Sequence, residues 1–329
     1  MTASSFPLPY RVYSTPMTTR FRRIDERDGV LIEGPAGWAE VSPFWDYDIP
    51  ESSNWLAAAL EAACIGYPEP VRESIPVNVT VPAITPEKAQ GIINRRGGCN
   101  TAKIKVAEKG QSLSDDVDRI RAVREIFDGK IRIDANGGWD EETAIHNLPI
   151  LDRAAGGLEY AEQPVPTVEG LARVRMAINV PIAADESIRR AEDPYEVARQ
   201  DAADLIIAKV QPLGGVNAYL NLARELNMPV VVSSALESSV GIAAGVALAA
   251  SLPTLDHACG LATVQLFERD VTTSSLLPTD GSLPVRPVTA DDVAPVSDEV
   301  AARWGERLDR MWQFLRENRD LSALTGGVL

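Results

Sequence analysis

Five short apolar runs recur along the middle of the chain, and each carries a charged residue near its end. The runs are KIKV (103–106), IRIDAN (131–136), LEYAEQP (158–164), IAADES (182–187) and DLIIAKVQP (204–212). From Lys105 through Asp134, Glu162 and Asp185 to Lys209, the steps are 29, 28, 23 and 24 residues. A strand, a helix and the next parallel strand need about 30 residues, so the spacing predicts successive strand–helix units. The charged side chains would then meet at one end of a sheet.

The same rhythm extends to both sides of these runs. Further strand candidates are SIPVNVTVPA (74–83), PVVVSSALES (229–238) and PTLDHACGL (253–261), which brings the total to eight. Strands rich in Val, Ile and Ala that alternate with amphipathic helices indicate a parallel sheet covered by helices. One such helix is expected to begin at Ser114. Eight units favour a closed barrel, with functional side chains at the carboxyl ends of its strands, over an open doubly wound sheet.

The two ends of the chain follow a different pattern. Short, partly alternating runs in the first fifty residues, with turns expected at Asp28-Gly29 and Pro35, predict a small antiparallel sheet. A helix should begin at Asn54 and another at about Ser297, the latter packing on the N-terminal sheet. The expected domains are therefore a cap built from 1–72 and 264–329 and a catalytic barrel of 73–263.

Composition and charge exclude several classes of protein. The net charge of −15 disfavours nucleic acid or an anionic membrane as a partner but not a small anionic substrate. Three widely spaced cysteines form no CxxC pattern, and the N-terminus lacks the features of a signal peptide. The most apolar stretch, 240–250, is too short to span a bilayer and suggests a buried helix. A cytoplasmic enzyme with a small-molecule substrate is expected, its oligomeric state undetermined.

The three strand-end acids point to a metal site. Asp134, Glu162 and Asp185 lie in apolar context, where an unpaired carboxylate would be costly. Carboxylate oxygens prefer Mg²⁺ or Mn²⁺ to zinc, and Asn136, Gln163 and Glu186 are close enough in sequence to orient such ligands. The alternative is a structural salt-bridge network.

The lysines are candidates for acid–base chemistry. Lys103 and Lys105 are two residues apart in a strand and so point the same way. Lysines are usually exposed, which is the alternative interpretation for both and for Lys209. If buried, their pKa could fall by about 3–5 units, into the range of a general base near neutral pH. Only two histidines are present, His146 and His257, so a mechanism that uses a His–Asp pair as the base is disfavoured.

The arrangement resembles the enolase superfamily, in its lysine-x-lysine branch, the muconate-lactonising subgroup. Lys103-x-Lys105, the acids on the third to fifth strands and Lys209 on the sixth carry this resemblance, which covers nearly the whole chain. Within that branch, the segments TPMTTRFRR…GVLIEGPAGWAEVSPF, IRIDANGGW and VVSSALESSVG are similar to the o-succinylbenzoate synthase family. The resemblance implies an α/β fold: a (β/α)7β TIM-like barrel with an α+β capping domain, whose loop at about 14–22 closes over the barrel mouth.

The resemblance also implies a reaction and roles for residues. A small carboxylate substrate would bind Mg²⁺, held by Asp134, Glu162 and Asp185, and be dehydrated in menaquinone biosynthesis. Lys105 would remove the ring proton and, as its ammonium, protonate the departing hydroxyl. Lys209 would face the ring as a cation, and Lys103 would hold the carboxylate and lower the pKa of Lys105. The succinyl tail would be received by Ser233 and the backbone near Gly260, with Arg132 in support.

Three other functions stay open at the level of sequence. An N-acylamino-acid racemase or dipeptide epimerase could use Lys105 and Lys209 on opposite faces of a carbon. Such epimerases display an Asp-x-Asp on the eighth strand, whereas the segment here reads LDHACG, with Asp256 alone. A metal-free Schiff-base aldolase using Lys209 and a non-catalytic binding protein are the remote alternatives.

Overall fold

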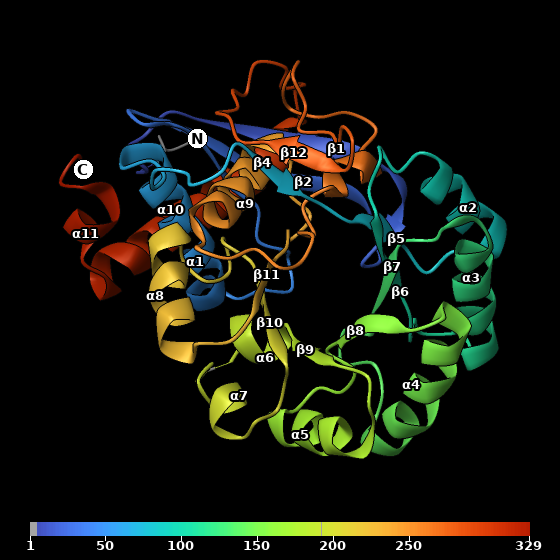
Figure 1. The fold of residues 1–329 in the computed structure, drawn as a ribbon. Helices are drawn as coiled ribbons and strands as arrows, with labels where there is room; N and C mark the ends of the chain where they lie inside the picture. Colours follow the sequence, from blue (N-terminus) through green and yellow to red (C-terminus); the bar gives the residue numbers. More distant parts are fainter. Residues whose placement is uncertain (1–4, 192) are drawn as a thin grey trace.

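The centre of the fold is a parallel sheet that curls into a ring with helices on its outside (Figure 1). The structure is a computed structural model and describes residues 5–191 and 193–329. Seven strands pair in sequence order: β5 (Val79–Val81), β6 (Thr101–Lys105), β7 (Lys130–Asp134), β8 (Leu158–Glu162), β9 (Ile182–Ala184), β10 (Leu205–Ala208) and β11 (Val230–Val232). The predicted alternation of strands and helices is therefore confirmed.

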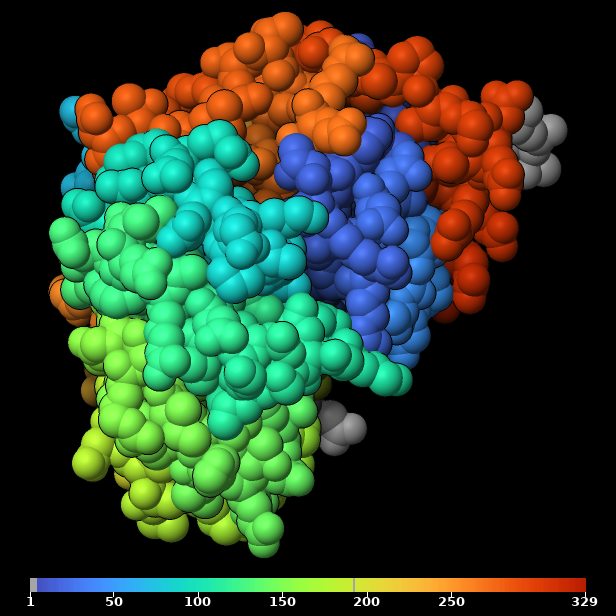
Figure 2. Space-filling view, turned by 90° about the vertical axis from the view of Figure 1, so that its right-hand side faces the viewer, coloured from blue at the N-terminus to red at the C-terminus, as the bar shows by residue number. Residues whose placement is uncertain are grey.

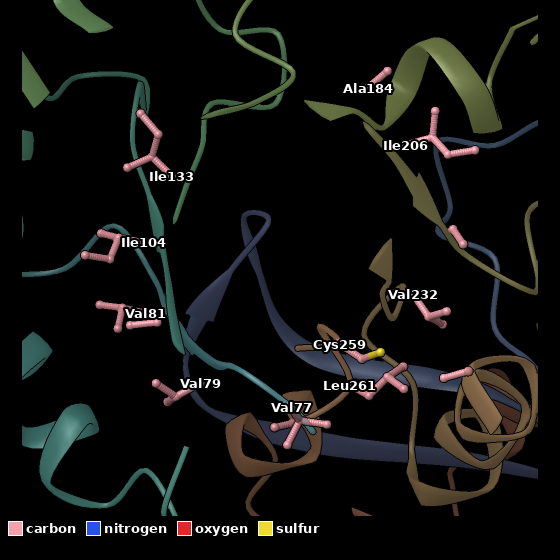
Figure 3. Close-up of a cluster of buried hydrophobic side chains, with 14 of the residues drawn as sticks. Val77, Val79, Val81, Ile104, Ile133, Ala184, Ile206, Val232, Cys259 and Leu261 are labelled. Atoms are coloured by element: carbon pink, nitrogen blue, oxygen red, sulfur yellow. The ribbon is translucent and has the colours of Figure 1, made fainter. Parts of the chain in front are cut away.

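Helices follow most of these strands and cover the outer face of the ring. They are α2 (Pro86–Asn94), α3 (Leu113–Ile126), α4 (Glu141–Ala155), α5 (Val168–Ala177), α6 (Glu186–Arg189), α7 (Glu196–Arg199), α8 (Val216–Leu226) and α9 (Ser239–Ser251). Ile104, Ile133, Ile206 and Val232 belong to the buried core and follow one another around the ring (Figure 3). Because strand side chains alternate, burying Ile104 against the helices turns Lys103 and Lys105 toward the inside.

The ring closes through two residues rather than through a full eighth strand. Cys259 bridges in parallel to Val77, and Gly260 bridges in parallel to Ser233. The Cys259 N–H donates to the carbonyl of Pro76 at 2.7 Å, and the Gly260 N–H to that of Val232 at 2.8 Å. The prediction of a strand over 253–261 is wrong in its length. Its first part carries proline and aspartate, residues that are rare in strands.

The strand predicted over 74–83 is also shorter than expected. It divides into β4 (Ser74–Pro76), which pairs antiparallel with β12 (Ser282–Pro284), and β5, which belongs to the barrel. The chain therefore changes partner at Val77, where it meets the closing residues.

The N-terminal segment forms the predicted antiparallel sheet from β1 (Tyr10–Phe21), β2 (Ile24–Gly34) and β3 (Gly37–Val41). The turn expected at Asp28-Gly29 is wrong, because both residues lie within β2, where Gly29 pairs with Tyr13. A Cβ atom at Gly29 would lie 2.7 Å from the Tyr13 ring, so the glycine serves close packing instead of a turn. The chain reverses at Arg22-Arg23, and the turn expected at Pro35 is confirmed.

The remaining cap elements are helices from both ends of the chain. Helix α1 (Ile49–Cys64) begins earlier than the predicted Asn54, because the Asp48 carboxylate accepts the N–H of Glu51. Helix α3 likewise begins after Ser112 and not at Ser114. Ser297 caps α10 (Asp298–Asn318) as predicted, and the chain ends with α11 (Leu321–Thr325) after the short 3-10 helix η1 (Thr263–Leu266).

The C-terminal helix packs back onto the N-terminal elements, as predicted. Trp304, Leu308, Met311 and Leu315 of α10 are buried in one core with residues of β2, β3 and α1. Figure 2 shows the N-terminal segment (blue) lying against the barrel (green), with the C-terminal segment (orange and red) beside it. The exact domain boundaries at 72/73 and 263/264 stay a prediction. Within the described residues, no helix is both long and apolar enough to cross a membrane.

Candidate active site

The charged residues predicted from the spacing meet at the carboxyl ends of neighbouring strands. Lys105, Asp134 and Glu162 end β6, β7 and β8, and the pairing register sets Lys105 beside Asp134 and Asp134 beside Glu162. Asp185 follows β9 directly, and Lys209 follows β10. Parallel strands in register bring their ends to one edge, which is why residues over 100 positions apart converge here.

All of these side chains are removed from water. Asp134, Glu162 and Asp185 are at most 1% exposed, and Lys103 and Lys209 are 6% and 7% exposed. The Lys105 side chain is 14% exposed. The alternative in which the lysines are ordinary surface groups is therefore wrong.

Each lysine is paired with a carboxylate. Lys103 Nζ lies 2.9 Å and 3.2 Å from the two oxygens of Glu162 and 3.4 Å from Asp134 Oδ2. Lys105 pairs with Asp134 and donates to Asn136 Oδ1 at 2.7 Å. Lys209 pairs with Asp185. Alternating buried charges of this kind stabilise one another only as a set, because removing one partner leaves another uncompensated.

The two lysines of β6 differ in acidity. Burial lowers the pKa of the Lys105 ammonium, and the nearby charge of Lys103 lowers it further against the opposing effect of Asp134. Burial acts in the same direction on Lys103, but the carboxylates of Glu162 and Asp134 outweigh it and raise its pKa well above the ordinary value. The lowered pKa expected for a general base is thus found at Lys105 and not at Lys103.

The acids also separate into two kinds. Burial and repulsion from Asp134 raise the pKa of Glu162 to about 7. Burial also acts to raise the pKa of Asp134 and of Asp185, but neighbouring cations outweigh it, and both pKa values lie well below the usual range. The cations are Lys105 and Lys103 for Asp134. They are Arg189 and Lys209 for Asp185. A further cation near Glu162 would reduce the electrostatic repulsion among the three carboxylates.

The donor chemistry of this cluster fits a hard divalent cation. All three acids supply only oxygen ligands, which Mg²⁺ and Mn²⁺ prefer. Among residues 5–191 and 193–329, however, no three His, Cys, Asp or Glu side chains are gathered tightly enough to hold a metal as they stand. The lysine ammonium groups occupy oxygens of all three acids. Shared coordination therefore requires these ammonium groups to withdraw.

The predicted orienting residues contact the site. Gln163 Oε1 accepts the N–H groups of Asp185 at 2.9 Å and Ser187 at 3.2 Å, which fixes the start of α6. Asn136 links Lys105 to Glu186, whose Oε1 lies 3.3 Å from Asn136 Nδ2. Both Asn136 and Gln163 have positive φ angles, 47° and 39°, a backbone region in which Asn is comparatively common.

Sequence reasoning missed Arg189. Its Nε lies 2.9 Å from Asp185 Oδ1, and its guanidinium also contacts Glu186 and the hydroxyl of Tyr47 in the cap. The signal in the sequence was its position four residues after Asp185 at the start of a helix, which brings the two onto one face. Its Tyr47 contact connects the cap with the acid cluster.

A cavity opens above the lysines and includes the residues predicted for the substrate tail. Its wall contains Lys103, Lys105 and Lys209 together with Asp134, Asn136, Thr80, Thr263, Ser233, Ser234, Ala235, Leu236, Gly260, Phe21 and Arg22. Phe21 and Arg22 come from the tip of the β1–β2 hairpin, and Lys105 Nζ lies 5.4 Å from the Phe21 ring centroid. The segment expected as a loop at 14–22 is therefore mostly strand, but its tip does cover the barrel mouth.

Arg132 lies deeper than expected for a substrate-binding residue. It is fully buried two residues before Asp134 and is not part of the cavity wall. Its Nε is 2.5 Å from Glu159 Oε2, and its Nη1 donates to the carbonyl of Ala258 at 2.7 Å. His257 pairs with the same Glu159 at 3.0 Å, so it too belongs to this lower layer and not to the acid cluster.

Comparisons with known proteins agree with this geometry. Residues 12–63 match a family model described as enolase N-terminal domain-like, and residues 86–289 one described as enolase C-terminal domain-like. The chain is 54% identical to the o-succinylbenzoate synthase of Thermobifida fusca, over 91% of this chain and 94% of that protein. It is 52% identical to that of Mycobacterium leprae, over 85% and 83%.

A solved structure shares the fold at lower sequence identity. The dipeptide epimerase of Enterococcus faecalis, solved with Mg and the dipeptide L-Leu-L-Tyr, superimposes with a TM-score of 0.71 at 22% identity. The match covers 88% of this chain and 99% of that one. At this level of identity the likeness concerns the fold alone.

Proposed function

The chain belongs to the enolase superfamily and, within it, to the o-succinylbenzoate synthases, and on that premise we propose how its own residues carry out the dehydration. The reaction is that of a hydro-lyase: 2-succinyl-6-hydroxy-2,4-cyclohexadiene-1-carboxylate loses a ring proton and a hydroxide and becomes o-succinylbenzoate, a step of menaquinone biosynthesis. The ring proton is adjacent to a carboxylate and only weakly acidic, so a site must supply both a base and stabilisation of the developing charge.

Lys105 is the proposed base, and the observation that carries this role is the position of its amine in the wall of the cavity, beside Asn136, where burial also lowers its pKa. A neutral Lys105 amine takes the ring proton. The resulting ammonium then gives a proton to the departing hydroxyl on the same face, so that water leaves and the lysine returns to its first state. Asn136, which accepts from Lys105 Nζ at 2.7 Å, holds the amine in place.

Lys209 and Lys103 supply fixed positive charge. Lys209 lies in the wall of the same cavity, where its ammonium faces the ring as a cation, a contact worth about 0.5–2 kcal/mol. Lys103 stays protonated because its carboxylate partners raise its pKa, and this charge both attracts the substrate carboxylate and favours the neutral form of Lys105.

Asp134, Glu162 and Asp185 are the residues that would hold Mg²⁺, with Mn²⁺ as the alternative. When bound, the metal supplies Lewis-acid stabilisation of the charge that develops on the substrate carboxylate, worth several kcal/mol. Gln163 and Arg189 fix Asp185 in position, through the backbone N–H of Asp185 and through its Oδ1 respectively.

The succinyl tail is assigned to the part of the cavity beside Ser233 and Gly260. These residues bridge the last barrel strand and the closing segment, and the Ser233 Oγ lies close to the carbonyl of Gly260, at 3.5 Å. Arg132 supports this arrangement from below by holding the carbonyl of Ala258.

The racemase or epimerase alternative has less support. Asp256, the one acid of the LDHACG segment, is exposed and precedes the closing residues Cys259 and Gly260 by three and four positions. It therefore lies toward the opposite end of the barrel from Lys105 and Lys209, away from the cavity wall. Nothing in the described residues favours the aldolase or the non-catalytic alternative.

A direct comparison of substrates tests the proposed function. The purified protein would be assayed with the cyclohexadiene and with an N-succinylamino acid, each at saturating Mg²⁺. We expect kcat/KM for dehydration to exceed that for racemisation. Faster racemisation, or no dehydration at all, would overturn the proposal.

A further inference from the structure

One cation in the wall of the catalytic cavity has no acidic partner within the part of the chain that the structure describes. Lys103, Lys105 and Lys209 are each paired with a buried carboxylate. Arg22 is exposed, and among residues 5–191 and 193–329 no carboxylate lies within ion-pair distance of its guanidinium. Its positive charge is therefore available to a ligand.

The backbone that presents Arg22 is held in an uncommon conformation. Arg22 and Arg23 have φ angles of 48° and 65° and form the two-residue reversal between β1 and β2. Asn-Gly is the usual pair in such a turn, because a side chain in the left-handed region costs about 1–2 kcal/mol per residue. Arginines retained at such positions suggest a role for the side chain they present.

A fixed aromatic platform carries the guanidinium. The Arg22 guanidinium carbon lies 4.3 Å from the centroid of the buried Phe44 ring. Arg27 contacts the same ring, also at 4.3 Å, and donates through Nε to the carbonyl of Leu236 at 2.8 Å. Leu236 is part of the cavity wall, so Arg27 connects the Phe44 ring with the surface proposed to bind the tail.

Arg22 also stands between the cavity and solvent. Besides the catalytic cavity, it borders an outer cleft of about 570 Å³, whose other charged lining residues are Arg23, Arg27, Arg189, Arg190, Glu26, Asp28, Asp46, Glu108 and Glu186. Three of these arginines are paired with acids: Arg23 lies 3.7 Å from Glu108, Arg189 pairs with Asp185, and Arg190 lies 3.1 Å from Glu51. Arg27 is buried and does not line the catalytic cavity. Among residues 5–191 and 193–329, Arg22 is thus the arginine that lines both spaces, and it forms no ion pair there.

We propose that Arg22 binds the carboxylate at the end of the succinyl tail and thereby determines specificity for a dianionic substrate. The inference rests on the proposed function, in which one carboxylate belongs to the metal and lysine cluster and the other lies on the tail. Ser233 and Gly260 offer only uncharged groups to that second carboxylate. A guanidinium matches it with two parallel N–H donors, which a lysine ammonium cannot reproduce.

The test compares two ligands in three variants. The variants are Arg22→Gln, Arg22→Lys and the control Arg23→Gln, which alters the same turn but not the cavity wall. The ligands are o-succinylbenzoate and 2-butanoylbenzoate, which has the same tail length without the second carboxylate; both are measured as inhibitors, alongside kcat and KM for dehydration. Wild-type dehydration is established first, so that failure of the proposed function is recognised separately.

For Arg22→Gln we expect the inhibition constant of o-succinylbenzoate to rise by roughly 10- to 100-fold, as for loss of a hydrogen bond to a charged group. The constant for 2-butanoylbenzoate should change by no more than about twofold. KM should rise more than kcat falls, Arg22→Lys should be intermediate, and Arg23→Gln should resemble the wild type. An equal loss for both ligands, or no loss for either in an enzyme that dehydrates normally, would overturn the proposal.

Discussion

Glu237 should make the stability of the protein fall as the pH rises toward neutrality, and Glu237→Gln should remove that dependence. The side chain is 3% exposed in the loop after β11. Its Oε2 accepts the N–H of Ala235 at 2.6 Å, and its Oε1 lies 3.3 Å from Gln211 Nε2. Burial, and then repulsion from the nearby Glu40, raise the pKa of Glu237 to about 7. A glutamine keeps an oxygen for Ala235 and has no proton to lose.

The size of the effect follows from the two pKa values. The unfolded chain releases this proton near pH 4.5 and the folded protein near pH 7, so between these values the folded state binds more protons. The free energy of unfolding therefore falls as the pH rises through this window. The difference of about 2.5, from 4.5 to 7, at about 1.4 kcal/mol per unit, corresponds to about 3–4 kcal/mol. The penalty is absent below pH 4.5 and complete above pH 7.

Urea unfolding at intervals from about pH 5 to 8.5 measures this penalty. The quantity of interest is the free energy of unfolding of Glu237→Gln minus that of the wild type. This difference should grow with pH by up to about 3 kcal/mol and level off above about pH 7. The control is Glu69→Gln, which removes a carboxylate at an exposed position. A constant difference for Glu237→Gln would refute the reasoning.

Three further substitutions examine the active site. Lys105→Ala should lower kcat by at least about 10²- to 10⁴-fold with unchanged circular dichroism, and substantial residual dehydration would remove its role as the base. Lys103→Met leaves the buried Glu162 without its ammonium at 2.9 Å. The free energy of unfolding of its metal-free form, measured with urea, should fall by about 3–5 kcal/mol, and Mg²⁺ should restore part of it. A loss that Mg²⁺ does not reduce would argue against a metal at Glu162. Gly260→Ala places a Cβ atom 2.5 Å from Ser233 Oγ, so KM should rise while kcat changes little; an unchanged KM would place the tail elsewhere.

The charged residues of the site could be predicted from the sequence because each of them lies at or near the end of a strand that the local sequence pattern identifies. Lys105, Asp134 and Glu162 end consecutive strands, and the in-register pairing of parallel strands brings strand ends together whatever the helices between them. The same reasoning predicted that Ser297 begins the C-terminal helix, since a cap depends on its nearest neighbours.

What the sequence did not predict depends on contacts between distant segments. The sequence predicts a turn at Gly29, whereas the contact that requires glycine there, with the ring of Tyr13, is made to another strand. The closing segment needed only Cys259 and Gly260, because strands already present on both sides supply their partners. The position of Arg189 four residues after Asp185 was a local signal, but its contact with Tyr47 could not be predicted because it joins segments 142 residues apart. Such pairings leave no periodic pattern in the chain.

The most direct measurement is dehydration of the cyclohexadiene with and without a divalent metal. The protein would be stripped with EDTA, assayed, and assayed again after Mg²⁺ or Mn²⁺ is restored. Turnover should vanish in EDTA and return with either metal. The reason is that negative charge develops on the substrate carboxylate, and the metal that the three acids would hold stabilises this charge. Full turnover in EDTA would contradict the assignment of Asp134, Glu162 and Asp185 as metal ligands.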